Sequence, residues 1–333
     1  MDGLLVIDKP VGPTSHDVVA RLRRTLDERR VGHTGTLDPT ASGVLPLVLG
    51  RATRLARFLI ASDKSYDAVI RLGVATNTYD SEGVPLGPPH SGLLPDRAAI
   101  NQALDAFRGT FLQQPPRYSA KKIGGRRSHR IARAYDERVR LKPDPAELNR
   151  SDSLDPPASL RLRAVPGPVS VTVYAIDILT VDGDTITLRV DCSAGFYVRS
   201  LAHDLGRRLG VGAHLARLCR TRSGDLTLDD AIPLAMAEND LARLVAAIIP
   251  PGRMLPHLPA AVLTREGTKR AEHGRDLGLE HFEKGDPSPL RGAWPQKAPM
   301  PLFVRLLDPA GDLIGLAEPS AAPGVLHPSV VLV

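Results

Sequence analysis

The sequence predicts an α+β fold with a mixed, largely antiparallel sheet, on the evidence of two strand patterns and an irregular order of elements. Apolar residues alternate with others from Tyr66 to Val74, which is the period-two pattern of a strand with one buried face. A second alternating run begins at Val169, reverses at Asp182-Gly183-Asp184 and continues to Cys192, as in an antiparallel hairpin. Strands and helices do not alternate strictly, and neither GxGxxG after a strand nor GxxxxGK(S/T) occurs. A dinucleotide-binding fold and a phosphate-loop ATPase are therefore disfavoured.

The N-terminal segment predicts a strand followed by a capped helix. Residues 3–7 are an apolar run of the length of a short buried strand. Thr14 to Asp17 has the spacing of a capping box, and the residues that follow place apolar side chains on one helical face. We expect this helix to end near Arg29-Arg30.

The next segment is rich in glycine and predicts an elaborate loop instead of a regular element. Glycines and small residues fill 32–43, whereas 44–49 is apolar enough to enter the core. Helical spacing of apolar residues then predicts further helices at 96–108 and 198–209.

The charge of the chain favours a polyanionic partner only if it is clustered. The 333 residues include 43 Lys and Arg against 37 Asp and Glu, a formal net charge of +6. Basic residues do gather in one segment, YSAKKIGGRRSHRIAR, around a flexible Gly124-Gly125 pair, so this segment predicts a clamp for a phosphate backbone. The residues of the predicted clamp are Lys121, Lys122, Arg126 and Arg127.

Cysteine usage and hydropathy predict a cytoplasmic protein without a metal site. Cys192 and Cys219 stand in neither a Cys-x-x-Cys nor a Cys/His ligand spacing, so we expect no disulfide framework and no zinc. No segment approaches the roughly 18 apolar residues of a membrane span, and the first residues do not resemble a secretion signal.

Asp38 is the strongest candidate for chemistry. It lies in GHTGTLDPTASG, where Pro39 restricts the backbone and the neighbouring glycines permit close approach of a substrate. A positioned, partly buried aspartate can act as a nucleophile. Because Asp-Pro is also a common turn pair, a purely structural turn is the preferred interpretation on spacing alone.

Arg199 is the second candidate, because it falls in the first turn of the helix predicted from Val198. There the helix dipole disfavours a cation by a few tenths to about 1 kcal/mol. Such an arginine invites a carboxylate partner or an anionic ligand. A solvated arginine beside the apolar stripe explains the sequence equally well.

Five motifs follow one another along the chain. They are DKPVGPTS (8–15), GHTGTLDPTASGVLPLVLGRATR (32–54), YSAKK (118–122), CSAGFYVRSLAHDLGRRLG (192–210) and GAHLARLCRTRSG (212–224). This ordered set resembles the bacterial TruB family, whose members are tRNA pseudouridine-55 synthases. The resemblance covers roughly residues 3 to 230, and its specificity comes from several separate motifs in one order.

The resemblance implies a role for each candidate residue. Asp38 would be the catalytic nucleophile on a flipped-out uridine, attacking either C6 of the base or C1′ of the ribose; the sequence leaves both routes open. Tyr66 would stack on the base, Tyr197 would line the pocket near the sugar, and Arg199 would pair with Asp38. Three further residues would line the pocket or contact the RNA: His33, Lys9 and Leu218.

The resemblance also implies a domain organisation. Residues 1–255 would form a catalytic domain of the pseudouridine-synthase fold, with an insertion at about 142–165. Residues 256–333 would form a small PUA-like RNA-binding β domain, interrupted by a proline-rich stretch at 283–301.

The expected function is a stand-alone tRNA pseudouridine(55) synthase. Isomerisation exchanges no electrons and consumes no second substrate, so we expect no cofactor and no metal. We expect the tRNA T-arm as the partner, no membrane, no obligatory protein partner and a monomer. A guide-dependent pseudouridine synthase subunit and a non-catalytic tRNA-binding or chaperone protein are the alternatives.

Overall fold

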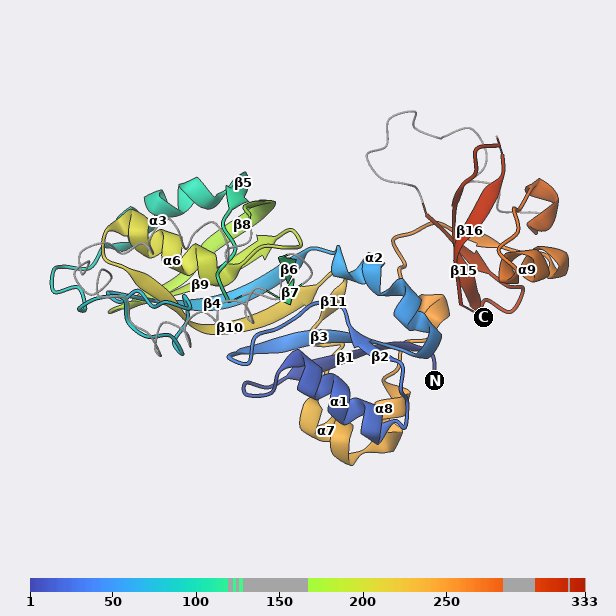
Figure 1. The fold of residues 1–333 in the computed structure, drawn as a ribbon, viewed down its shortest axis with the longest axis horizontal. Helices are drawn as coiled ribbons and strands as arrows, with labels where there is room; N and C mark the ends of the chain where they lie inside the picture. Colours follow the sequence, from blue (N-terminus) through green and yellow to red (C-terminus); the bar gives the residue numbers. More distant parts are fainter. Residues whose placement is uncertain (119–121, 124–125, 128–166, 284–302, 323, 333) are drawn as a thin grey trace. The chain divides into compact units, whose positions relative to one another are not determined.

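A computed structural model describes residues 1–118, 122–123, 126–127, 167–283, 303–322 and 324–332 (Figure 1). These residues fall into two compact units. The insertion predicted at 142–165 lies outside the described residues, as does nearly all of 283–301. The predicted domain boundary after residue 255 stays a prediction. Both units combine segments that are far apart in the sequence: the first comprises Met1–Pro39, Val44–Ala61 and Leu226–Val333, and the second comprises Thr40–Gly43 and Ser62–Asp225.

The N-terminal part of the first unit is built on two buried strands. β1 (Gly3–Lys9) is parallel to β12 (Ile232–Pro233) and neighbours β3 (Ala41–Leu49), which also pairs antiparallel with β2 (Val31–His33). Helix α1 packs against β2 and against α7, and α7 packs against β1. The short helices of this unit before residue 255 are α1 (Ser15–Thr25), η1 (Gly50–Leu55), α2 (Ala56–Ile60), α7 (Leu234–Asn239), α8 (Leu241–Ala246) and η3 (Pro251–Arg253).

Helix α1 begins as predicted and ends earlier than predicted. Thr14 is its N-cap, and the capping box with Asp17 is present. The last helical residue is Thr25, because Leu26 caps the helix and Asp27 takes a positive φ of 47°. The expected end near Arg29-Arg30 is therefore wrong by about one turn.

The prediction of an irregular loop over 32–43 is wrong at both ends of that range. Strand β2 pairs Val31, Gly32 and His33 with Leu49, Val48 and Leu47, and β3 already begins at Ala41. Glycine weakens a strand, but here the backbone ladder with a fully buried partner outweighs that preference. The irregular part is confined to the turn between the two strands, which contains Asp38.

The second unit contains the predicted antiparallel sheet. Its strands follow the order β10-β4-β9-β8-β5, each antiparallel to its neighbour, and the first residues of β3 add to β10 in parallel. Both the alternating strand and the hairpin that turns at Gly183 are confirmed. The strands are β4 (Lys64–Leu72), β5 (Gly109–Gln113), β8 (Val169–Asp182), β9 (Thr185–Cys192) and β10 (Ala213–Ser223).

Two helices cover one face of this sheet. α3 (Arg97–Leu104), extended by η2 (Asp105–Phe107), and α6 (Val198–Leu209) lie over the same side of β4, β9 and β10 (Figure 1). The alternate residues of the strands that point to this side form one apolar core with the two helices. The helices predicted at 96–108 and 198–209 are thereby confirmed.

The last part of the chain forms a separate four-stranded sheet, in line with the small C-terminal β domain predicted. β13 is parallel to β14, and β15 is antiparallel to both of its neighbours, β14 and β16, with helix α9 packed beside β15 and β16. Its own apolar core includes Leu263, Leu306 and Leu326. Its elements are β13 (Ala260–Val262), α9 (Arg265–Glu272), η4 (Leu279–His281), β14 (Val304–Leu307), β15 (Leu313–Pro319) and β16 (Leu326–Val331).

Gly206 provides a test of how closely α6 packs on β10. A Cβ at Gly206 would lie 2.2 Å from the amide nitrogen of Ala213 and 2.6 Å from its Cβ. We expect Gly206→Ala to lower the free energy of unfolding by about 1 to 3 kcal/mol, because overpacking displaces backbone. An uncrowded helical glycine would instead gain about 1 kcal/mol from alanine. Urea unfolding measures the sign, with exposed Arg208→Ala as the control; a stabilised variant would contradict this packing.

Candidate active site

The turn that contains Asp38 is anchored by backbone contacts on both sides. The hydroxyl of Ser15, in the first turn of α1, accepts a hydrogen bond from Leu37 N at 2.8 Å and donates one to Leu37 O at 3.1 Å. Gly12 N donates to Pro39 O at 2.8 Å. Ser15 and Leu37 are buried, whereas Asp38 is half-buried. The carboxylate thus stands on a fixed backbone and keeps access to solvent, as a nucleophile for an external substrate requires.

Lys9 and His33 belong to the same unit as Asp38. Lys9 ends β1 and is fully buried, with its ammonium donating to Pro10 O at 2.8 Å. His33 ends β2, and its ring meets that of His16 edge-on at 5.0 Å between centroids. Lys9 therefore fixes the start of the DKPVGPTS segment from within the core, while His33 lies half-buried at the start of the Asp38 turn.

Tyr66 and Leu218 lie on neighbouring strands of the second unit. Tyr66, in β4, is 9 % exposed and belongs to the core cluster under α6, opposite Val190 in β9. Leu218, in β10, pairs with Ala68 of β4 on one side and with Ala41 of β3 on the other. Leu218 therefore lies beside the start of β3, and Tyr66 lies one strand further from it, opposite Arg220 of β10.

Tyr197 is the N-cap residue of α6, and a single side-chain amide holds its backbone. Gln113, the last residue of β5, accepts from Tyr197 N at 2.8 Å and donates to Tyr197 O at 3.0 Å. Gln113 is 2 % exposed. Because both backbone groups are fixed, the direction in which the Tyr197 side chain leaves the helix is fixed as well.

Arg199 is buried in the first turn of α6 and donates to two other segments of the unit. Its guanidinium donates to Thr78 O at 3.3 Å, to Asp80 Oδ2 at 3.4 Å and to Tyr118 O at 2.8 Å. The Arg199 and Asp80 side chains are each 9 % exposed. The sequence left open a carboxylate partner, an anionic ligand or a solvated arginine, and the structure shows a buried carboxylate partner, Asp80.

Asp80 is a residue that the sequence reasoning missed. It stands 119 positions before Arg199 in a turn-rich stretch, TNTYDSEG, that contains no periodic signal. The only hint was a carboxylate among turn residues, which is common in loops. The predicted pairing of Arg199 with Asp38 joins the two compact units and stays a prediction.

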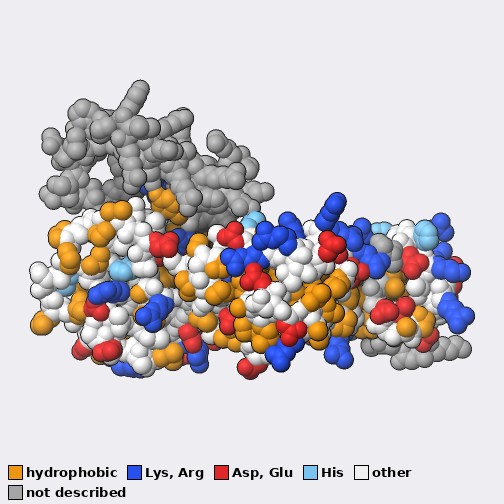
Figure 2. Space-filling model, turned by 90° about the horizontal axis from the view of Figure 1, so that it is seen from below, with side chains coloured by type: hydrophobic (Ala, Val, Ile, Leu, Met, Phe, Trp, Pro, Cys, Tyr) orange, Lys and Arg blue, Asp and Glu red, His pale blue; other side chains and the backbone are white. Residues whose placement is uncertain are grey.

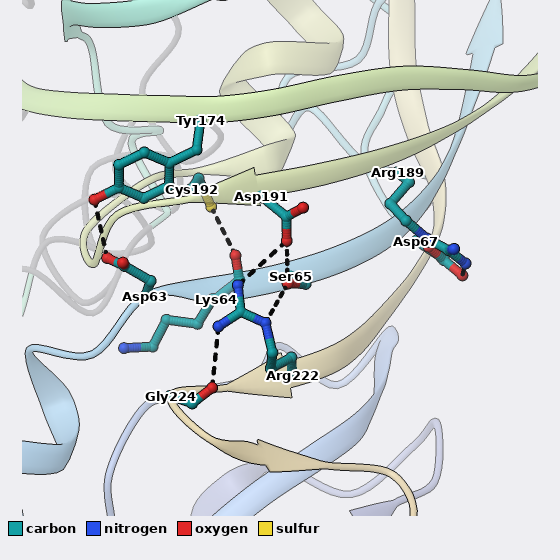
Figure 3. A network of polar contacts seen from close by, with 10 residues as sticks. All are labelled: Asp63, Lys64, Ser65, Asp67, Tyr174, Arg189, Asp191, Cys192, Arg222 and Gly224. Atoms are coloured by element: carbon teal, nitrogen blue, oxygen red, sulfur yellow. Dashed lines mark hydrogen bonds and ion pairs between the residues drawn. The ribbon is translucent and has the colours of Figure 1, made fainter. Parts of the chain in front are cut away.

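A polar network on the opposite face of the sheet fixes the strand that carries Tyr66 (Figure 3). Arg222 of β10 donates to Ser65 Oγ at 2.8 Å and to Asp191 of β9 at 3.3 Å, and Ser65 also binds Asp191. Arg189 forms a two-pronged pair with Asp67 at 2.8 and 2.9 Å. Because Ser65 and Asp67 flank Tyr66 in β4, these contacts fix the register that turns Tyr66 toward the helices.

Two titratable groups in this region have strongly shifted pKa values because they are buried. Burial lowers the pKa of Lys64 to about 8, and the neighbouring Arg220 cation lowers it further. Burial also raises the pKa of the Cys192 thiol to about 12, and its Sγ lies 3.6 Å from Lys64 O. Cys192 is thus a neutral core group at physiological pH.

The predicted RNA clamp is described only as backbone. β6 (Lys122–Ile123) and β7 (Arg126–Arg127) pair antiparallel, which brings Lys122 opposite Arg127, while Lys121 lies outside the described residues. On the face seen in Figure 2, Lys and Arg side chains lie among Asp and Glu side chains. The clamp therefore stays a prediction.

Neither a metal cluster nor a membrane-spanning helix is found among the residues that the structure describes. Within those ranges no three His, Cys, Asp or Glu side chains are grouped as metal ligands would be. No helix in the same part of the chain is long and apolar enough to cross a membrane.

Two family models match the chain. Residues 23–164 match the N-terminal domain of TruB family pseudouridylate synthase, and residues 199–248 match the C-terminal domain of tRNA pseudouridylate synthase B. The second match ends before residue 256, so it does not extend to the part predicted to be PUA-like.

Similar proteins share the whole length of the chain. tRNA pseudouridine synthase B of Solibacter usitatus is 40% identical over 100% of both chains, and that of Burkholderia lata is 38% identical over 100% of this chain and 91% of its own. Among solved structures, an H/ACA RNP bound to a substrate RNA containing 2'-deoxyuridine has a TM-score of 0.66 at 25% identity. A Cbf5-Nop10-Gar1 complex has a TM-score of 0.65 at 26% sequence identity. Each covers 99% of this chain and 85% of the other.

Removing Asp80 should show how much the buried pair contributes to stability. Asp80→Asn removes the carboxylate that Arg199 binds within its own unit, and we expect the free energy of unfolding to fall by about 3 kcal/mol. The control is Asp184→Asn, whose pair with Arg71 is shorter, at 2.7 Å, but exposed, and should change stability by less than about 1 kcal/mol. Equal losses in urea unfolding would show that burial does not decide the strength of these pairs.

Lys64 should make stability depend on pH in the alkaline range. Its folded pKa of about 8 lies below its ordinary value of 10.5, so between these values the unfolded chain binds more protons. The destabilisation from burying the ammonium is complete below about pH 8 and is relieved as pH rises toward 10.5. The free energy of unfolding of the wild type should therefore rise relative to that of Lys64→Met over this range. A pH-independent difference in urea unfolding would contradict the lowered pKa.

Proposed function

Because the chain belongs to the TruB family of pseudouridylate synthases, we propose that it is a stand-alone tRNA pseudouridine synthase acting on the T-loop uridine at position 55. The observation that carries this proposal is the 40% identity to tRNA pseudouridine synthase B of Solibacter usitatus over the full length of both chains. In the reaction the N1–C1′ bond breaks and a C5–C1′ bond forms. A proton leaves C5 and N1 becomes protonated, so no electrons enter or leave.

Asp38 is the proposed nucleophile. The anchored turn supports this role, since Ser15 and Gly12 fix the backbone on either side of Asp38 while its side chain stays half-exposed. The target uridine would be flipped out of the RNA, at an unstacking cost of a few kcal/mol, so that its sugar and base reach the carboxylate. Attack at C6 and attack at C1′ are both compatible with one oriented carboxylate.

The other residues would receive and orient the uridine. Tyr66 would stack on the base, Tyr197 would lie near the sugar, and Leu218 would close the apolar side of the pocket. The positions of Tyr66 and Tyr197 are consistent with this, because the sheet and Gln113 fix their backbones. Arg199 would orient Asp38 while itself held by Asp80.

The RNA would be held outside the pocket by His33, by the basic clamp and by the C-terminal domain. His33 would contact the RNA beside the Asp38 turn. Lys9, which is fully buried, would support the wall of the pocket from the core. Lys121, Lys122, Arg126 and Arg127 would neutralise phosphates along the T-arm. Residues 256–333 would add a PUA-like RNA-binding domain to the catalytic domain of residues 1–255.

A stand-alone enzyme is favoured over a guide-dependent subunit. The H/ACA and Cbf5 structures share the fold at 25% and 26% identity, whereas the bacterial relatives reach 40%. We accordingly propose a cytoplasmic monomer that needs neither a guide RNA nor a protein partner. A non-catalytic tRNA-binding protein is the alternative from another class, and retention of Asp38, Tyr66, Tyr197 and Arg199 speaks against it.

Asp38→Asn tests function and nucleophile together. The amide keeps the size of the side chain but lacks the charge of a nucleophile. We expect the wild type to convert one T-loop uridine of an unmodified tRNA transcript without guide RNA or cofactor. The variant should bind the transcript and form no detectable pseudouridine, as mapped by position.

Two controls make this assay decisive. Asp229→Asn, an exposed carboxylate, should keep wild-type turnover, and a transcript with cytidine at position 55 should remain unmodified. If the wild type and Asp38→Asn both bind the transcript but form no pseudouridine, the hypothesis of a guide-dependent subunit or of a non-catalytic tRNA-binding protein replaces the proposal. If Asp38→Asn reacts at the wild-type rate, the function stands and Asp38 is not the nucleophile.

A further inference from the structure

The loop of residues 76–86 presents two acceptors to Arg199 and is closed by its own hydrogen bonds. Asn77 N donates to Val84 O at 3.0 Å, and the Asn77 side chain accepts from Val84 N at 2.9 Å. Thr76 Oγ1 donates to Asp80 O at 2.7 Å. These bonds join the two arms and the tip of loop 76–86, so a contact that fixes the tip also fixes the acceptors.

The residue between the two acceptors has an unusual backbone. Thr78 O and Asp80 Oδ2 both accept from Arg199 NH1, and Tyr79 lies between them with φ at +68°. A bulky side chain rarely adopts this left-handed conformation unless its surroundings enforce it. The reversal at Tyr79 allows a backbone carbonyl and a carboxylate two residues apart to meet the same guanidinium nitrogen.

The ring of Tyr79 rests on the ring of His203. The centroids are 3.8 Å apart and the planes differ by 14°, so the rings are in face-to-face van der Waals contact. His203 follows Arg199 by four residues in α6, and side chains at this spacing lie on the same helical face. One helix thus supplies both the guanidinium and the ring against which the loop that binds it is stacked.

The tip of the loop has a second attachment, on strand β10. Leu215 N donates to Tyr79 O at 2.9 Å, and Ser81 N donates to Leu215 O at 3.1 Å. These bonds fix the position of the tip along β10 through its backbone, and the stack on His203 contacts it through the side chain of Tyr79.

We propose that Tyr79 and His203 are positioning residues for pseudouridine formation, whose stacked rings hold loop 76–86 in the conformation that presents Thr78 and Asp80 to Arg199. This inference rests on the proposed function, in which Arg199 orients the nucleophile. Neither ring needs to touch the RNA. Their effect reaches the chemistry through Asp80 and Arg199.

The first arm of the test measures turnover on the tRNA transcript. His203→Ala removes the ring, and we expect kcat to fall roughly two- to tenfold, as a lost aromatic contact would give, with KM nearly unchanged. His203→Phe restores a flat ring and should restore kcat. Loss of binding alone, or failure of the phenylalanine to rescue, would overturn the proposal.

Tyr79 variants separate the ring from the backbone. Tyr79→Phe keeps the stack and should keep kcat. Tyr79→Gly relaxes the positive φ but removes the ring, so it should lose kcat as His203→Ala does. Full activity of the glycine variant would show that the stack holds nothing that catalysis needs.

A double-mutant cycle separates positioning from general damage. If His203 acts through Asp80, His203→Ala should lower kcat further by little in an Asp80→Asn background. If His203→Ala lowers kcat by the same factor in the Asp80→Asn background as in the wild type, His203 does not act through Asp80 and the proposal is overturned.

The second arm of the test needs no RNA, so it tests the stacked pair even if the protein does not form pseudouridine. Hydrogen exchange of the amides of Ser81 and Leu215 should accelerate in His203→Ala and Tyr79→Gly, and not in His203→Phe. A wild type that forms no pseudouridine would reject the function, whereas unchanged exchange in His203→Ala would reject the positioning pair.

Discussion

The burial of the Arg199 guanidinium is the constraint around which the second compact unit arranges its functional residues. Removing a cation from water costs several kcal/mol, and the first turn of α6 adds an unfavourable helix dipole. Acceptors from loop 76–86 and from Tyr118 offset this cost. The segment that supplies Tyr118 also holds the start of α6, because Gln113 binds the backbone of Tyr197 and Gln114 O accepts from Ser200. The buried Arg199 charge thus fixes the positions of loop 76–86, the segment from Gln113 to Tyr118 and the N-terminus of α6 relative to one another.

The sheet of the second unit positions Tyr66 through the register of its strands. Tyr66 shares the buried face of β4 with Ala68 and Ile70. Its neighbours are bound on the other face, Ser65 to Asp191 and Arg222, and Asp67 to Arg189 (Figure 3). A slip of one residue would exchange the two faces and turn Tyr66 away from the core. Each exposed pair contributes little to stability by itself. Their value lies in opposing the slipped register, which would leave several of them unpaired at once.

The sequence predicted what depends on neighbouring residues and missed what depends on distant ones. The capping box at Thr14, the hairpin at Gly183 and helix α6 are local patterns, and the structure confirms them. Strand β2 depends on pairing with β3, which no local window shows. The early end of α1 follows from the left-handed backbone of Asp27, which the helical spacing did not indicate. The Asp38 turn was recognised through its GHTGTLDPTASG motif and the family resemblance, whereas its anchors Ser15 and Gly12 became visible only in the structure. Asp80 was missed because its partner lies 119 residues away.

The conformation of Tyr79 shows how strain and precision are linked in this site. A left-handed backbone at a bulky residue costs about 1 to 3 kcal/mol, and it persists only where the surroundings over-determine it. Here the surroundings are the hydrogen bond to Leu215 and the ring of His203. A relaxed backbone would separate Thr78 O from the Asp80 carboxylate, and the buried cation would lose an acceptor. The strain at Tyr79 is therefore tolerated, because releasing it would remove an acceptor from the buried Arg199 cation, which costs more free energy. The conformation of the loop and that of the helix thus depend on one another.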